Sequence, residues 1–124
     1  CDLNFVRGED SFVRAHWAAA GPWQVPFVWQ PYRQLDLAHR HKLSGWSGKI
    51  LSAPQLSVLR DLHWIWNQLG PAGQELEFRG GPDLHRDWSA FCQHYRQVQS
   101  HLHRSCLNLA RQQGLEANLI RFIR

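Results

Sequence analysis

Residues 83–113 read DLHRDWSAFCQHYRQVQSHLHRSCLNLARQQ, and their spacing predicts one long helix. The large apolar residues recur at alternating steps of four and three, which places them on one helical face. They are Leu84, Trp88, Phe91, Tyr95, Val98, Leu102 and Leu109. Pro82 and Asp83 suit a helix start, and Gly114 suits a stop. Such a helix is about 45 Å long, so we expect one end to project from a domain whose radius of gyration is about 14 Å.

A second helix is predicted over residues 54–69, because Pro54 suits a first turn and Gly70 with Pro71 ends the run. This helix is apolar on two faces, as expected for a helix in the middle of a bundle. We therefore predict an all-α fold, a small helical bundle built on an antiparallel hairpin of residues 54–69 with residues 83–113.

The remaining segments are shorter. Residues 10–20 have the caps and the broad apolar face of a short helix. Residues 22–31 contain three prolines, which impose an extended path, so we predict a Pro/Trp-rich strap that covers the core or, alternatively, offers an aromatic ledge to a ligand. Four further predictions are a helix or strand over residues 32–43, a loop over 44–49, a link or lone strand over 74–79, and a last helix over 115–124.

The 124 residues fit one domain with one modest core. In this organisation residues 1–53 supply the short helix, the strap and a basic loop, and residues 54–124 supply the hairpin and the C-terminal helix. No segment is long and apolar enough to span a membrane, and no signal peptide is visible.

Three cysteines, Cys1, Cys92 and Cys106, lack the spacing of a disulfide framework. The last two lie roughly 21 Å apart on one predicted helix, too far to bond to each other. We therefore expect a reducing, cytoplasmic compartment. The sequence begins at Cys1 and contains no methionine, which indicates truncation, processing or a lipidated N-terminal cysteine.

The formal charge of +4 lies entirely in residues 88–124, and twelve of the 14 cations are arginine. Arginine suits phosphates, carboxylates and aromatic faces. An outer helical face of arginines and glutamines predicts contact with a nucleic-acid backbone, and a solvated or protein-contact face is the alternative. The predicted contact residues are Arg96, His103, Arg104, Arg111, Arg40, Lys42 and Lys49.

Motifs for catalysis and metal binding are weak. The loop Gly45-Trp46-Ser47-Gly48-Lys49 lacks the first glycine and the final hydroxyl of a phosphate-binding P-loop, and the helix that follows a Gly-x-x-Gly loop in KH domains cannot form so close to Pro54. His101, His103 and Cys106 place only two potential ligands on one helical face, and zinc needs more. We therefore predict no metal and no cofactor.

These observations favour a protein without enzymatic activity. We predict a small helical subunit of a larger assembly, which docks on other proteins through exposed Trp23, Trp29 and Trp46 and contacts nucleic acid through its arginine face. One alternative is an adaptor or assembly factor without nucleic acid. Another is a small metal-independent ribonuclease, in which His39 and His41 exchange protons beside Lys49 and Arg33. Self-association is left open.

Overall fold

The computed structural model describes residues 2–32, 38–67, 81–112 and 119, apart from the side chains of residues 81 and 82. The described residues are mostly helical, with a small two-stranded parallel sheet. The elements in chain order are β1 (Asn4–Arg7), α1 (Glu9–Ala20), β2 (Phe27–Gln30), α2 (Ala38–Ile50), the 3-10 turn η1 (Pro54–Leu56), α3 (Ser57–Trp66), α4 (Gly81–Gln93) and α5 (Tyr95–Arg111).

The sheet is the main departure from the predicted all-helical bundle. Strand β1 pairs in parallel with β2, so that Asn4 lies opposite Phe27 and Arg7 opposite Gln30. Helix α1 connects the two strands and completes a βαβ unit. The predicted strap is therefore wrong in part, because its centre is a buried strand. A parallel strand that is covered on both faces is a continuous apolar run, and the prolines at 26 and 31 stand just outside the paired residues.

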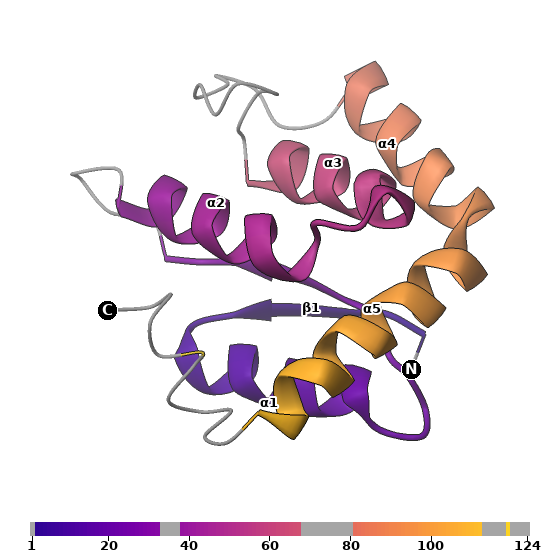
Figure 1. Cartoon of the computed structure of the whole chain (residues 1–124). Helices are drawn as coiled ribbons and strands as arrows, with labels where there is room; N and C mark the ends of the chain where they lie inside the picture. The colour runs from indigo at the N-terminus through magenta and orange to yellow at the C-terminus, as the bar shows by residue number, and fades with distance from the viewer. Residues whose placement is uncertain (1, 33–37, 68–80, 113–118, 120–124) are drawn as a thin grey trace.

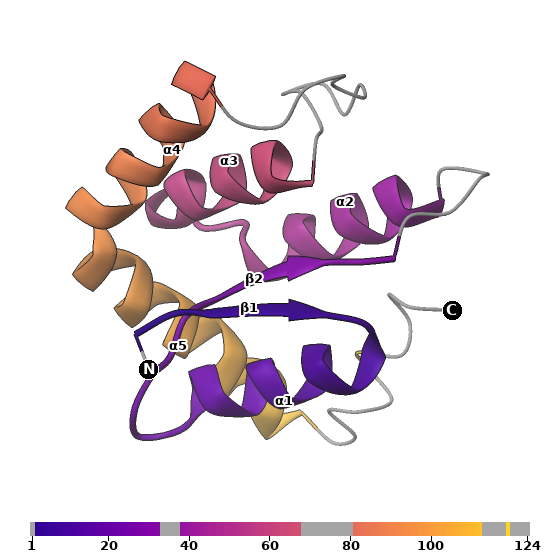
Figure 2. The same ribbon diagram turned by 180° about the vertical axis from the view of Figure 1, so that it is seen from behind.

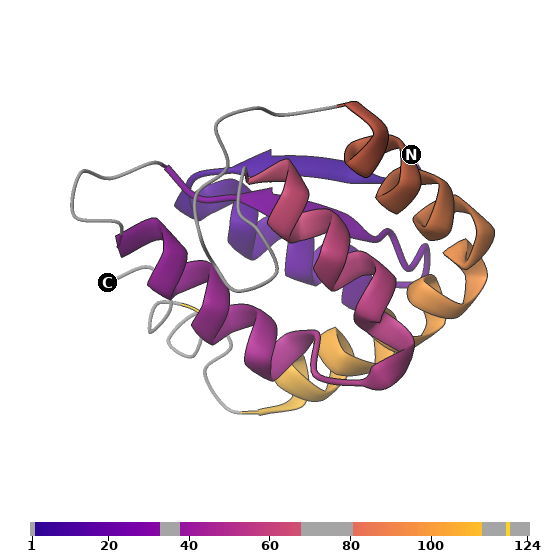
Figure 3. The same ribbon diagram turned by 90° about the horizontal axis from the view of Figure 1, so that it is seen from above.

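Helices cover the sheet on both sides. Helix α1 lies beside β1, and α2 with α3 lies beside β2 on the opposite side of the strand pair (Figures 1 and 2). Helices α4 and α5 form a bent arm along the side where the strands begin (Figure 3). The strands end on the opposite side, where the chain enters α1 (Figure 2). This leaves the carboxyl ends of the strands away from the bend of the arm.

The predicted helix over residues 83–113 is broken at His94, whose φ of −105° and ψ of 19° separate α4 from α5. The backbone N–H of His94 donates to the oxygen of Ala90 at 3.1 Å, and the N–H of Val98 donates to the oxygen of His94 at 2.9 Å. Backbone hydrogen bonding therefore continues through the bend. Helix α3 packs on α4, whereas α5 packs on α1 and η1. The predicted antiparallel hairpin is thus not confirmed, because the bend carries α5 away from α3 and onto α1 and η1.

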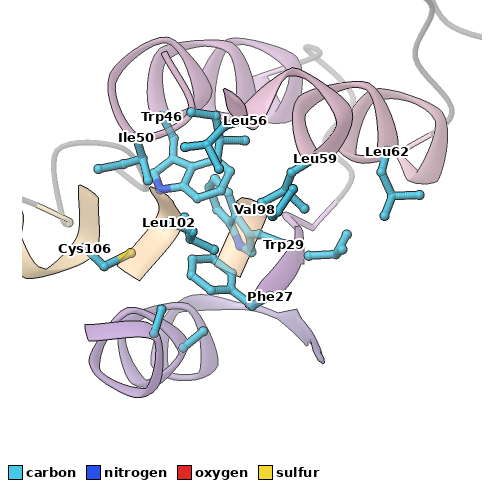
Figure 4. Close-up of a cluster of buried hydrophobic side chains, with 14 of the residues drawn as sticks. Phe27, Trp29, Trp46, Ile50, Leu56, Leu59, Leu62, Val98, Leu102 and Cys106 are labelled. Carbon is cyan, nitrogen blue, oxygen red and sulfur yellow. The ribbon is translucent and has the colours of Figure 1, made fainter. Parts of the chain in front are cut away.

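The core forms where α5, β2, α2 and α3 meet (Figure 4). The Trp29 ring stacks on Phe12 with centroids 3.9 Å apart, and Trp46 meets Trp29 edge-on at 5.6 Å. The predicted apolar seam of α5 is confirmed, since its inward residues are fully or almost fully buried. They are Val98, Leu102, Cys106 and Leu109. Burial raises the pKa of the Cys106 thiol to about 12.

Helix α2 occupies the place of the predicted loop over residues 44–49. Its buried residues recur at helical spacing and are His39, Leu43, Trp46, Ser47 and Ile50. Glycine inside a helix costs about 1 kcal/mol relative to alanine, and this helix contains two, Gly45 and Gly48. Burial of the Trp46 ring offsets that cost, because a fully buried aromatic side chain contributes roughly 2–3 kcal/mol.

Helix α1 confirms the predicted short helix, and η1 with α3 confirms the helix predicted from Pro54. The segments predicted over residues 74–79 and 115–124 lie outside the described residues, except for Leu119, which is buried. Within the described residues, no helix is long and apolar enough to cross a membrane.

Candidate functional site at the carboxyl edge of the parallel strands

The most distinctive local geometry lies between β1 and α1. Strand β1 ends at Arg7, and helix α1 begins at Glu9, so Gly8 alone makes the turn. Its φ of +83° lies in the left-handed region, which favours glycine because a Cβ there meets the backbone. A single residue thus joins β1 to α1 and sets the direction in which the helix leaves the strand.

Tyr32 closes this turn from the side of β2. A Cβ added at Gly8 would lie 3.1 Å from Cε2 of Tyr32 and 3.2 Å from its hydroxyl oxygen. The guanidinium carbon of Arg7 lies 5.0 Å from the centroid of the same ring, within the range of a cation–π contact. Gly8 is therefore needed both for its torsion and for the space that Tyr32 occupies.

The first turn of α1 presents both backbone donors and carboxylates. In the described part of the chain no side chain caps this helix, so its first backbone N–H groups are open to a ligand. Glu9, Asp10 and Ser11 are exposed. Within the same described residues, neither carboxylate forms an ion pair. The edge therefore places the first backbone N–H groups of α1 beside two exposed carboxylates.

The cationic residues that were predicted to contact nucleic acid are divided between two helices. Arg96, Arg104 and Arg111 are exposed on α5, while Arg40, Lys42 and Lys49 lie along α2. His103 is part of the packing, because its Nδ1 lies 2.9 Å from the backbone oxygen of Ala19 and joins α5 to α1. The structure thus does not gather the predicted cations into one site.

Two of the three tryptophans predicted to dock partners are in the core. Trp29 is 1% exposed and Trp46 is 0% exposed, so the prediction is wrong for both residues. They are buried because the two rings fill the space between α1, α2 and α3. Trp23, by contrast, is 83% exposed.

The predicted ribonuclease pair does not converge. His39 is buried and His41 exposed on α2, because residues two apart on a helix point to different sides. Lys49 also belongs to this helix, so residues 45–49 do not form a phosphate-binding turn, and Arg33 lies outside the described residues. In the described ranges, no three His, Cys, Asp or Glu side chains gather into a metal site.

Two other histidines hold the core together. His16 accepts the indole N–H of Trp46 at its Nε2, 2.9 Å away, and its Nδ1 lies 2.7 Å from the backbone oxygen of Phe12. His63 makes the same kind of contact to the Leu59 oxygen, at 2.9 Å. Burial lowers the pKa of each to about 4, although the bond to the backbone oxygen acts in the opposite direction. Both imidazoles are therefore neutral at pH 7.

Sequence reasoning missed the edge because its residues form no familiar catalytic motif. The run Arg7-Gly8-Glu9-Asp10-Ser11 is a glycine followed by two acids and a hydroxyl, which resembles an ordinary helix start. The strand before it has only four residues, too few for a clear alternating pattern. The available signal was a short strand, Asn4–Arg7, that is followed at once by a glycine and two acids.

In parallel α/β sheets, ligands bind beyond the carboxyl ends of the strands, and anions bind at helix N-termini. The βαβ unit of this mostly helical protein therefore makes the carboxyl edge of its two strands a candidate ligand-binding site.

The comparisons with known proteins identify the family. The sequence pattern of the family described as Elongation-Factor P (EF-P) rhamnosyltransferase EarP matches residues 1–124, and the chain belongs to the EarP family.

Three relatives carry the name protein-arginine rhamnosyltransferase. The Pseudomonas putida protein is 34% identical over 127 residues, which cover 100% of this chain and 29% of that protein. The Pseudomonas aeruginosa protein is 39% identical over 66 residues, 53% of this chain and 16% of that protein. The Shewanella oneidensis protein is 56% identical over 43 residues, 35% of this chain and 10% of that protein. The chain thus spans less than a third of the length of these relatives.

Membership of this family overturns the functional predictions made from the sequence. The expectation of a non-enzymatic accessory subunit with a nucleic-acid interface is wrong, and so are the adaptor and ribonuclease alternatives, because the family and its relatives are named for glycosyl transfer. The error arose because an arginine-rich helix face was interpreted as a phosphate-backbone contact. The same composition also suits a solvated surface.

Proposed function

We propose that this chain is part of an enzyme that transfers rhamnose to an arginine side chain of elongation factor P. The match of the family pattern to every residue of the chain carries this proposal. It is supported by the relative from Pseudomonas putida, whose name specifies transfer of rhamnose to protein arginine. Elongation factor P is accordingly the protein partner that we propose.

The chemistry of such a transfer sets two requirements. The bond between C1 of rhamnose and the oxygen of its leaving group breaks, and its electron pair stays on that oxygen. A guanidino nitrogen of the acceptor forms a new bond to C1 and loses a proton. Hydrogen-bond donors must therefore stabilise the leaving oxygen. A base must also accept the proton, because guanidinium has a pKa above about 12.

The carboxyl edge contains groups of both kinds. Arg7 and the backbone N–H groups at the start of α1 suit an anionic, phosphate-type leaving group. The exposed carboxylates of Glu9 and Asp10 are suited to accept the proton that the guanidino nitrogen loses and to accept hydrogen bonds from the hydroxyls of the sugar. Tyr32 holds Arg7 through the cation–π contact at 5.0 Å. We therefore assign donor binding and proton acceptance to residues 7–11, with Tyr32 as a positioning residue.

A chimera tests the proposal. The segment of the Pseudomonas putida relative that matches this chain, 29% of that protein, is replaced by residues 1–124. The product is incubated with elongation factor P and an activated rhamnose. We expect the mass of elongation factor P to increase by one deoxyhexose, located at an arginine by fragmentation. A folded chimera without this product, beside an active parent enzyme, would contradict the proposal.

Three variants of the chimera test the edge itself. Arg7→Ala, Glu9→Gln and Asp10→Asn are each expected to lower the rate, by roughly 100-fold where a group contacts the leaving oxygen or takes the proton. Arg104→Ala is the matched control, because it removes an exposed cation from α5. Full activity in all three edge variants would show that the reactive site lies elsewhere in the enzyme.

A further inference from the structure

A pocket of about 460 Å³ lies at the other end of the strands. It is lined by Asp2, Trp23, Val25, Tyr95 and Gln99. Asp2 precedes β1 and Val25 precedes β2, whereas the candidate active edge follows both strands. The extended chain from Asp2 to Gly8 spans roughly 20 Å. The pocket is therefore separate from the proposed rhamnosyl-transfer site.

The walls of the pocket are held by hydrogen bonds between distant parts of the chain. The hydroxyl of Tyr95 donates to the backbone oxygen of Asp2 at 2.7 Å. The backbone N–H of Asn4 donates to the oxygen of Pro26 at 3.0 Å. These bonds join the segment before β1 to α5, and the first residue of β1 to the segment before β2. The pocket is thus a product of the tertiary fold.

Trp23 stands on a defined turn at the rim. The N–H of Gln24 donates to the oxygen of Gly21 at 3.1 Å, and the N–H of Val25 donates to that of Ala18 at 3.3 Å. Gln24 has a φ of +50°, in the left-handed region that residues other than glycine seldom adopt. This turn presents an indole that is 83% exposed. Exposed tryptophans on fixed supports are typical anchors for partners.

The pocket that Trp23 lines also contains a negative charge, because Asp2 is among its lining residues. The Asp2 carboxylate is close enough to act on Tyr95, whose pKa is raised by burial first and by this carboxylate second. The charge of Arg96 acts on Tyr95 in the opposite direction, but Arg96 does not line the pocket. A pocket lined by a carboxylate, an indole and an amide suits a cation that can form both an ion pair and a cation–π contact.

We propose that the pocket formed by Asp2, Trp23, Tyr95 and Gln99 binds a cationic side chain, an arginine or a lysine, presented by a partner protein. The carboxylate of Asp2 pairs with the cation, and the Trp23 ring covers its face. Val25 contacts the methylene stem. This inference is independent of the proposed rhamnosyl transfer, because none of these residues belongs to the carboxyl edge.

The test uses two small probes and the whole 124-residue chain labelled with ¹⁵N. Nα-acetyl-arginine amide is titrated at low ionic strength, and the uncharged citrulline analogue is the control. The Trp23 indole N–H signal is assigned from its loss in Trp23→Phe. We expect arginine amide to shift this signal and citrulline amide to bind at least about tenfold more weakly, since the ion pair is lost. Equal binding of the two probes would overturn the proposal.

Four variants test which residues bind the cation. Asp2→Asn and Trp23→Ala are each expected to weaken binding of arginine amide by about tenfold, whereas Trp17→Ala, an exposed tryptophan outside the pocket, leaves it unchanged. Arg96→Ala should strengthen binding, because it removes a like charge. Unchanged binding in Asp2→Asn, or weaker binding in Arg96→Ala, would exclude a cation site. The remaining indole signals report in each case that the fold is intact.

Discussion

The backbone N–H of Trp29 donates to the Nε2 atom of His63 at 3.0 Å. The side-chain amide of Asn67 donates to the backbone oxygen of the same tryptophan, also at 3.0 Å. Both contacts lie on the side of β2 that does not pair with β1. Helix α3 thereby supplies the hydrogen bonds that a third strand would otherwise make at this edge.

Loss of the His63 imidazole should therefore destabilise the fold. His63→Ala leaves a buried backbone N–H without its acceptor and opens a cavity, so we expect the free energy of unfolding to fall by about 2–4 kcal/mol. Urea denaturation followed by circular dichroism measures the change. His41→Ala, at an exposed position of α2, is the control and should change stability by less than about 0.5 kcal/mol. Equal midpoints would contradict the role of His63.

Stability should also fall in mild acid. The pKa values of His16 and His63 are lowered to about 4 by burial, below the ordinary value of about 6.5. Between these values the unfolded chain binds more protons than the folded chain, so stability is fully present above about pH 6.5 and is lost as the pH falls towards 4. Each histidine contributes a slope of about 1.4 kcal/mol per pH unit in this window.

Urea midpoints measured from pH 4.5 to pH 7.5 test this dependence. His63→Gln removes one titrating group and is expected to flatten the curve, whatever its effect on stability at pH 7. A wild-type curve that is flat across this range would show that the buried imidazoles do not control acid stability.

Gly48 is a site where stability should increase. It lies within α2, it is exposed, and a Cβ at this position would have no heavy atom within 4 Å. Gly48→Ala should raise the free energy of unfolding by about 0.5–1 kcal/mol, because alanine loses less backbone entropy and favours helix. A lower denaturation midpoint in this variant would indicate that residues 44–49 are not helical in solution.

Gly8 should respond in the opposite way. Alanine at this position must adopt a φ of +83° and must place its Cβ 3.1 Å from the Tyr32 ring, with a cost of roughly 1–3 kcal/mol from the torsion alone. In the chimeric enzyme, Gly8→Ala should reduce rhamnosyl transfer, because the start of α1 shifts. Gly48→Ala in the same chimera serves as the control and should retain full activity.

The two cysteines in the described residues should differ in reactivity. Cys92 is exposed, whereas Cys106 is buried and burial raises its pKa to about 12. Thiolates are the reactive species, so iodoacetamide at pH 8 should modify Cys92 in the folded chain and Cys106 only after denaturation. Peptide mass spectrometry distinguishes the two sites. Equal rates in the native chain would show that α5 does not bury Cys106.

The sequence by itself determined the elements that depend on local spacing. The helix over residues 10–20, the helix that follows Pro54 and the apolar seam of α5 were predicted correctly, because residues three and four apart on a helix share a face. The prolines and glycines that end these segments act through torsions of the adjacent residues, and they too can be recognised without knowledge of the fold.

Only the tertiary structure decided the parallel pairing of β1 with β2, the bend at His94 and the helical state of residues 44–49. The pairing and the helix depend on contacts between residues distant in sequence: the ladder joins residues 23 positions apart, and Trp46 stabilises a glycine-containing helix by packing against Trp29. The candidate site depends on the same contacts, because Gly8 and Tyr32 meet only once β1 and β2 have paired. Local propensity is worth less than about 1 kcal/mol per residue, and burial of one large aromatic side chain exceeds it.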